Sequence, residues 1–273
     1  MTFDQNNPWI KRNITYIYGV PYVAFGFWFG NKMLGEREKV YKKLVANIGP
    51  PFYLITIDNI SDFEFPKHPF NPAVTFTLKN KKGLSGVHLS DYFRTYISYH
   101  YGGAYHDIKL RMENQSISTC WEIFEDPNVW VVGMPNRRGG ASDPEVIDYI
   151  INHETYNPNT TLTEKGKWNY RNLKDDRLIG NGGWIARPKT LLFQKVNDFV
   201  EIRLKKLFQM IRSNPVENFK RCCLNGEVFM YPVAWAALQG NIFHPYQVIY
   251  FSHINRNMPI FEKAQYRHSS ENV

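Results

Sequence analysis

Apolar positions along the chain change between strand-like and helix-like spacing. Residues 14–29 are rich in Tyr, Val and Phe, which is typical of strands, whereas residues 34–48 place apolar side chains three and four positions apart, as on one face of a helix. Residues 52–57 predict a further strand, after a Gly-Pro-Pro sequence that ends the helix. Strands that alternate with helices in this way predict an α/β fold with a mainly parallel central sheet flanked by helices.

The segment from Ser90 to Gly103 predicts a helix with defined ends. Ser90 is a good N-cap residue, because its hydroxyl can accept a hydrogen bond from a backbone N–H of the first turn. Gly102 and Gly103 should end the helix, since glycine readily takes the left-handed conformation found there. A buried stripe is expected from the apolar residues at helical spacing, namely Phe93, Tyr96, Ile97 and Tyr101.

Residues 104–110 look extended and carry Asp107 to the end of a strand. In an open α/β sheet, ligands bind beyond the carboxyl ends of the strands. Asp91, Arg94 and Ser98 share another face of the preceding helix, because residues three and four apart are neighbours there. The polar face of the helix and the end of the strand can therefore converge on one ligand.

The second half of the chain has a weaker pattern. Residues 118–125 predict a short helix and residues 129–134 a strand, whereas residues 135–180 are irregular. So long an irregular segment in a compact domain is usually disordered or functional. Residues 181–186 predict another strand, and Pro188 fits the first turn of a long helix.

Length and composition fit one large α/β domain. The chain has 273 residues, of which 43% are hydrophobic, and we expect a single domain over residues 1–262 with a polar tail over residues 263–273. Its three cysteines show no framework spacing, and neither a signal-peptide pattern nor a membrane-spanning apolar run is found. These features predict a soluble, intracellular protein of the cytoplasm without a transmembrane segment.

The chain is basic, with a formal net charge of +8. Basic proteins suit anionic ligands such as nucleotide diphosphates, anionic glycans and nucleic acid. Lys and Arg are spread along this sequence and form no long run. Nucleic-acid binding therefore ranks last among the functions considered, and no nucleic-acid partner is expected.

The central segment matches a known pattern in order and spacing at eight positions: Ser90, Asp91, Arg94, Tyr101, Gly102, Gly103, Tyr105 and Asp107. The segment resembles the donor-binding segment of the Asp-X-Asp sugar-transferase group and of the related capsular-polysaccharide-synthesis transferases. Weaker similarity lies at residues 27–32 and 181–188. The resemblance implies a single GT-A-like glycosyltransferase domain that moves a sugar from a UDP- or GDP-sugar to a glycan or glycosylated acceptor, mostly with retention of configuration.

Lys109 stands where that family has the second Asp of its motif. In the family this second Asp is the stronger ligand of a divalent metal, Mn²⁺ or Mg²⁺, whereas a protonated lysine binds no metal. Three interpretations stay open. Lys109 could replace the metal near the diphosphate, a metal could be held by Asp107 with a distant ligand such as His253 or Asp176, or Lys109 could point into solvent.

The resemblance also implies roles for other side chains around the donor. Asp91 and Arg94 resemble the pair that grips the donor's sugar hydroxyls and phosphate, and an exposed ion pair on the helix is the structural alternative. Trp28 could stack on the base, unless it is a core residue, and Tyr18 could approach the nucleotide from the end of the first strand. The remaining candidates for donor binding are Tyr105, Asp107, Lys109 and Asn181.

Asp176 and Glu227 are candidate general bases, which an inverting enzyme needs beside the acceptor hydroxyl. The alternative for each of them is a solvated surface carboxylate that has no part in the reaction. Asp107 is the main catalytic candidate. Because of Lys109, an inactive relative that binds a nucleotide sugar or a glycan without transfer is the alternative function.

Overall fold

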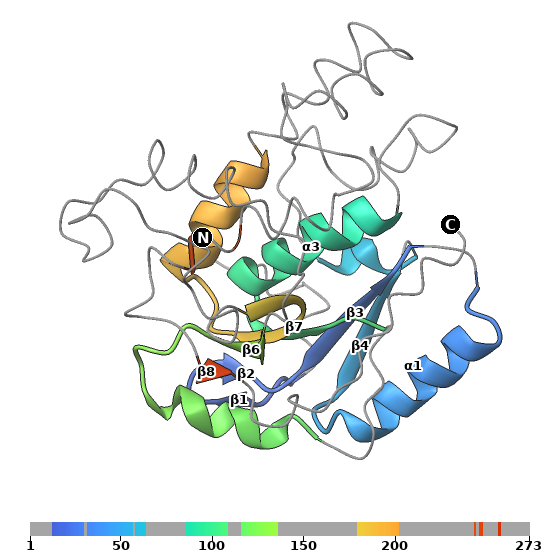
Figure 1. Cartoon of the computed structure of the whole chain (residues 1–273), viewed down its shortest axis with the longest axis horizontal. Coiled ribbons are helices and arrows are strands. Elements are labelled where there is room, and N and C mark those ends of the chain that lie inside the picture. Colours follow the sequence, from blue (N-terminus) through green and yellow to red (C-terminus); the bar gives the residue numbers. More distant parts are fainter. Residues whose placement is uncertain are drawn as a thin grey trace, which may run out of the picture.

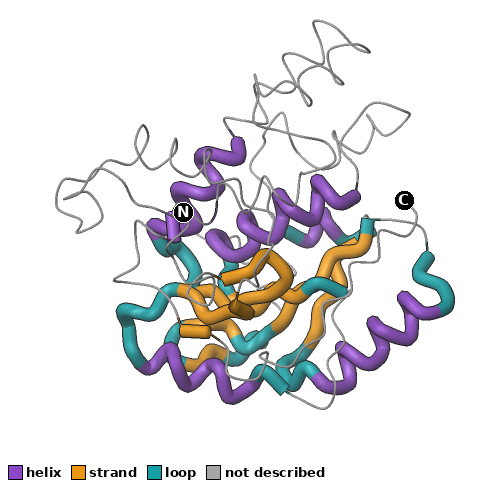
Figure 2. Tube along the Cα trace, in the orientation of Figure 1, coloured by secondary structure: helices purple, strands orange, loops and turns teal. Residues whose placement is uncertain are grey.

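A mixed β-sheet forms the centre of the described part of the chain (Figure 1, Figure 2). The computed structural model describes residues 13–29, 32–56, 58–63, 86–108, 116–135, 179–201, 243, 246–247 and 256–257. Within these ranges the strands lie in the order β4-β3-β5-β7-β6-β8. In that order they comprise Phe52–Thr56, Ala24–Trp28, Gly103–His106, Ile179–Ala186, Val131–Pro135 and Arg256–Asn257.

Strand direction decides which strand ends lie at the same edge of the sheet. β3 runs parallel to β4 and β5, whereas β7 runs antiparallel to β5 and β6. The α/β class is therefore confirmed, and the described sheet is mixed, because β7 alone runs opposite to its other strands. The sequence of residues 179–186 does not encode this reversal of strand direction. We call the edge that holds the carboxyl ends of β3, β4, β5 and β6, together with the first residues of β7, the carboxyl edge.

Helices cover both faces of the sheet. α3 (Gly86–His100) and a helix over residues 191–201 lie on one face, which we call the α3 face (Figure 1). α1 (Glu36–Asn47) and the 3-10 helix η3 (Ser118–Glu125) lie on the other, the α1 face. The helices expected near these positions are thus confirmed. A small hairpin of β1 (Tyr16–Ile17) and β2 (Val20–Pro21) precedes β3, and a 3-10 turn, η2 (Ile60–Asp62), follows β4.

Alternate strand residues feed two separate cores, because successive side chains of a strand point to opposite faces. On the α3 face the ring of Phe27 lies 6.0 Å from that of Phe93 and 5.4 Å from that of Tyr105. The expected stripe of α3 is buried there, as Phe93, Tyr96, Ile97 and Tyr101. On the α1 face the core is aliphatic and aromatic, and it includes Ala24, Leu44, Ala104, Trp121 and Ile185.

The two ends of α3 differ from each other in how well the sequence predicts them. The helix begins at Gly86, so Ser90 lies inside it and the predicted N-cap is wrong. No helix breaker stands between Gly86 and Ser90, and the helix therefore extends past the serine. The C-terminal prediction is confirmed, because Gly102 and Gly103 follow the helix with φ of 74° and 86°. A Cβ on Gly102 would lie 2.6 Å from Pro188 Cδ, which adds a steric reason for glycine.

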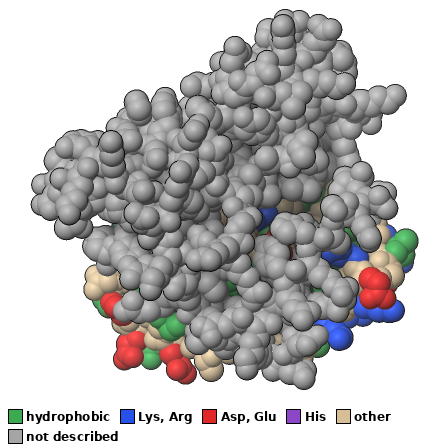
Figure 3. All heavy atoms as spheres, in the orientation of Figure 1, with side chains coloured by type: hydrophobic (Ala, Val, Ile, Leu, Met, Phe, Trp, Pro, Cys, Tyr) green, Lys and Arg blue, Asp and Glu red, His purple; other side chains and the backbone are tan. Residues whose placement is uncertain are grey.

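Charge on the α1 face is divided between its two helices (Figure 3). Acidic side chains gather over η3, where Glu122, Glu125 and Asp126 are exposed. The exposed lysines of α1 are partly neutralised, since Lys39 and Lys42 pair with acidic residues of the same helix at 2.8 Å. Among the residues that the structure describes, no helix combines the length and the apolar character needed to cross a bilayer.

Candidate functional site

Asp107 follows β5 directly and lies at the carboxyl edge. Its backbone N–H donates to the carbonyl of Gly182 at 2.8 Å, which extends the antiparallel pairing of β5 with β7. The Asp107 side chain is 21% exposed. The predicted position of this carboxylate, at the carboxyl end of a strand, is therefore confirmed.

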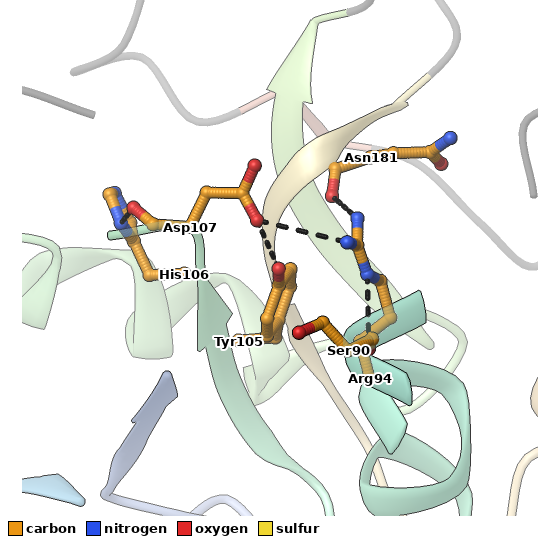
Figure 4. Close-up of polar contacts among 6 residues, drawn as sticks. All are labelled: Ser90, Arg94, Tyr105, His106, Asp107 and Asn181. Carbon is orange, nitrogen blue, oxygen red and sulfur yellow. Dashed lines mark hydrogen bonds and ion pairs between the residues drawn. The ribbon is translucent and has the colours of Figure 1, made fainter. Parts of the chain in front are cut away.

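Arg94 reaches the same place from α3 (Figure 4). Its side chain is only 7% exposed, and Nη2 lies 3.8 Å from Oδ1 of Asp107. Nη1 donates to the carbonyl of Asn181 at 2.5 Å, and Nε donates to the carbonyl of Ser90 at 3.5 Å. The guanidinium thus connects α3, the start of β7 and the Asp107 carboxylate, so it is not the exposed ion pair of a helix surface.

Tyr105 completes this group from within β5. Two residues before Asp107, it points to the same face of the sheet, and its hydroxyl donates to Asp107 Oδ1 (Figure 4). The Arg94 guanidinium carbon lies 4.7 Å from the centre of the Tyr105 ring. Phe27 and Trp184 enclose the same ring, with centroids 5.4 Å and 5.3 Å away, and Tyr105 is only 3% exposed.

The two oxygens of the Asp107 carboxylate have different surroundings. Oδ1 receives the Tyr105 hydroxyl and faces Arg94. Among the described residues no hydrogen bond reaches Oδ2, which Figure 4 shows turned away from Tyr105 and Arg94. One side of this carboxylate is therefore held by the protein, and the other is available to a ligand.

His106 lies between Tyr105 and Asp107 but points to the α1 face. It is buried, and its Nδ1–H donates to the carbonyl of Asp107 at 2.9 Å. Burial lowers the pKa of His106 to about 4, against the smaller opposing effect of Asp107. The imidazole is therefore neutral at pH 7 and acts as a structural hydrogen-bond donor behind the carboxylate.

Of the other candidates for donor binding, the structure describes Trp28 and Tyr18. Trp28 ends β3 at the carboxyl edge but points to the α1 face, where Arg37 lies 6.0 Å from its ring. Tyr18 lies at the opposite edge, because its carbonyl accepts from Arg187, which follows the end of β7. The structure thus brings Arg94, Tyr105, Asp107 and the backbone of Asn181 together, and leaves Tyr18 apart from them.

Several candidates lie outside what the structure describes. The side chain of Asp91 belongs to these, although its backbone is part of α3. So do four whole residues, namely Lys109, Asp176, Glu227 and His253. Their suggested roles stay predictions.

Gln247 supports the site, and the sequence pattern did not reveal it. Its buried side-chain amide accepts from the backbone N–H of Ile179 at 2.9 Å and donates to the carbonyl of the same residue at 3.3 Å. This pair of bonds anchors the first residue of β7, close to Asn181 and Gly182. A single glutamine with no motif around it gives no sequence signal for such a role.

The described residues do not make a complete metal site. Mg²⁺ prefers six oxygen ligands in octahedral geometry. Within the described ranges, no three His, Cys, Asp or Glu residues come together in a way that could hold an ion. Asp107 Oδ2 could still share an ion with the phosphate oxygens of a ligand, which is a common arrangement for Mg²⁺.

Comparison with known proteins adds no relative to this description. No protein-family model, curated protein or solved structure matches the chain. The geometry itself offers a fixed carboxylate at the carboxyl edge, with one oxygen turned outward, beside a buried arginine and tyrosine.

Proposed function

We propose that this protein is a glycosyltransferase with a GT-A-like domain. It would transfer a sugar from a UDP- or GDP-sugar to a glycan or glycosylated acceptor, with retention of configuration. The observation that carries the proposal is Asp107, a carboxylate directly after a parallel strand with Oδ2 turned outward at the carboxyl edge. The sequence resemblance supports it, since Arg94 and Tyr105 belong to the same pattern and contact Asp107.

The proposed reaction breaks the bond between the anomeric carbon and the diphosphate oxygen. The acceptor oxygen bonds to that carbon, and the proton of the acceptor hydroxyl passes to the leaving diphosphate. Positive charge develops on the sugar ring and negative charge on the leaving diphosphate. Asp107 would orient the donor by accepting a hydrogen bond from a sugar or ribose hydroxyl at Oδ2. Because this bond has a charged acceptor, it would be stronger than a bond between neutral groups.

Charge on the diphosphate needs a cation nearby. A bound Mn²⁺ or Mg²⁺ would supply it as a Lewis acid, and the ammonium group of Lys109 is the alternative source in this sequence. A retaining transfer makes little demand on a protein base, so Asp176 and Glu227 would act as general bases only if the enzyme inverts configuration.

The first experiment is calorimetric binding of a panel of UDP- and GDP-sugars, once with Mn²⁺ and once with a chelator. We expect one donor to bind, and Asp107→Asn to weaken that binding about 10- to 100-fold, as for the loss of a hydrogen bond to a charged group. Glu122→Gln is the matched control, because it removes an exposed carboxylate on the α1 face.

The comparison of binding with Mn²⁺ and with chelator distinguishes the two sources of positive charge, a bound metal ion and Lys109. Binding that persists in chelator favours Lys109, and binding that requires Mn²⁺ favours a metal. Donor binding without any transfer or donor hydrolysis would favour the inactive relative. Equal affinity in wild type and Asp107→Asn would contradict the proposed site, and binding of no donor would contradict the proposed function.

A further inference from the structure

The sequence resemblance puts Arg94 and Tyr105 in contact with the donor, but the structure puts both behind Asp107. Their exposure is low, at 7% for the Arg94 side chain and 3% for Tyr105, against 21% for the Asp107 side chain. A group this deeply buried has little surface to offer a ligand. Asp107 is the most exposed of the three.

The guanidinium of Arg94 is held on two sides by backbone. Nη1 donates to Asn181 of β7 and Nε to Ser90 of α3, which fixes the plane of the group. In this plane Nη2 lies 3.8 Å from Asp107 Oδ1. Arginine suits this task because its planar fork can address several acceptors at once.

The ring of Tyr105 has little freedom to turn. Phe27, Trp184 and the Arg94 guanidinium all lie within 5.4 Å of its centre. The hydroxyl therefore stays at Asp107 Oδ1, on the same oxygen that Arg94 faces. Both contacts restrain the rotation of the carboxylate about its own bond.

We infer that Arg94 and Tyr105 are positioning residues that hold Asp107 by Oδ1, so that Oδ2 is the oxygen that meets the nucleotide-sugar donor. This inference rests on the proposed function for the identity of the ligand, but the contact itself exists without ligand. Tyr105 then affects donor affinity only by holding Asp107. Replacing Tyr105 should therefore have no effect on donor affinity once the Asp107 carboxylate is removed.

A double-mutant cycle of Tyr105→Phe and Asp107→Ala tests this, with Asp107→Ser as a second background if the alanine variant does not fold. Thermal unfolding without ligand is the first readout. Tyr105→Phe should lower the unfolding midpoint by about 2–4 °C in the wild type and have no further effect once the carboxylate is gone.

The dissociation constant of the tightest-binding nucleotide sugar is the second readout. Tyr105→Phe should raise it about 3- to 10-fold in the wild type and leave it unchanged in the Asp107→Ala background. Tyr53→Phe is the matched control, because the Tyr53 hydroxyl donates to another carboxylate, Asp62, at 2.9 Å. It should lower the midpoint while leaving donor affinity unchanged, which separates positioning from general stability.

The outcomes separate the inference from the proposed function. Equal losses of donor affinity from Tyr105→Phe in both backgrounds would mean direct donor contact and would overturn the inference, while the glycosyltransferase proposal stands. Independent effects on the unfolding midpoint would overturn it as well. If no donor binds the wild type, the proposed function fails, and the unfolding cycle still decides whether Tyr105 holds the carboxylate.

Discussion

His106, the last residue of β5, and Asp107, the residue after it, point to opposite faces of the sheet. Asp107 presents a carboxylate to solvent on the α3 side, whereas His106 is buried on the α1 side and donates to the carbonyl of Asp107. Alternation along an extended chain separates the two side chains, although they are adjacent in sequence. A buried imidazole at this point makes the stability of the fold depend on the protonation of a histidine.

Stability should fall as the pH drops below the ordinary histidine pKa. In the native state His106 has a pKa of about 4, lowered by burial, whereas in the unfolded chain it titrates near its usual value of about 6.5. Above pH 6.5 neither state is protonated, and below it only the unfolded state takes up a proton, until the native pKa is reached. The contribution of His106 is therefore complete above the unfolded pKa and is lost between about pH 6.5 and 4, by about 3 kcal/mol.

Urea unfolding at pH 7, 6 and 5 measures this effect. His106→Gln should flatten the pH dependence in this range. His100→Gln is an informative comparison, because burial and the nearby Lys189 also lower the pKa of His100 to about 4. The same slope in the wild type and in His106→Gln would contradict the assignment.

At the scale of elements, Arg187 fastens three segments together at the edge opposite the site. Its guanidinium donates to the carbonyls of Tyr18 at 2.7 Å, Phe124 at 2.9 Å and Val129 at 3.3 Å. These carbonyls belong to the β1–β2 turn, to η3 and to the approach to β6. The Arg187 side chain therefore provides hydrogen-bond donors for three carbonyl groups that lie outside the strands.

Arg187→Lys should cost about 2 kcal/mol of unfolding free energy, because one ammonium group cannot address all three carbonyls. Hydrogen exchange should accelerate in the β1–β2 turn and at the end of η3. Donor affinity should stay unchanged, since the site lies at the other edge. Denaturant unfolding measures the loss, and Lys39→Ala, whose side chain is 72% exposed, should change it by less than about 0.5 kcal/mol.

Local patterns predicted most elements but not their arrangement. Helical spacing over residues 34–48 and the Gly102-Gly103 pair led to α1 and to the end of α3, because periodicity and φ preference are local properties. The direction of β7 depends on how the chain returns to the sheet, and no local pattern records that. The same limit applies to the site. Asp107 could be predicted from its place after a strand, whereas the bond from Arg94 to the carbonyl of Asn181 could not, since it joins α3 to β7.

At the scale of the whole molecule, Gln247 links the C-terminal part of the chain to the site. Gln247→Leu removes both hydrogen bonds to the backbone of Ile179, and we expect it to lower the unfolding free energy by about 2 kcal/mol. Donor binding should weaken as well, because the next residues of β7, Asn181 and Gly182, contact Arg94 and Asp107. Gln194→Leu, an exposed glutamine on the helix over residues 191–201, is the matched control.

Hydrogen exchange of residues 179–182 together with donor calorimetry would check this link. A loss of stability without any change at the start of β7 would contradict it. Unchanged donor affinity in Gln247→Leu would mean that the site tolerates movement of β7, and that Gln247 contributes to stability alone.

The pairing of Pro135 with Ile179 has a consequence for how this protein can diversify. The chain leaves β6 at one of these residues and enters β7 at the other, so residues 136–178 depart and return at a single point beside the carboxyl edge. A segment inserted in this way can be lengthened, shortened or exchanged while the neighbouring strands keep their register. The architecture therefore lets the length of residues 136–178 change without a change in the strand register that positions Asp107.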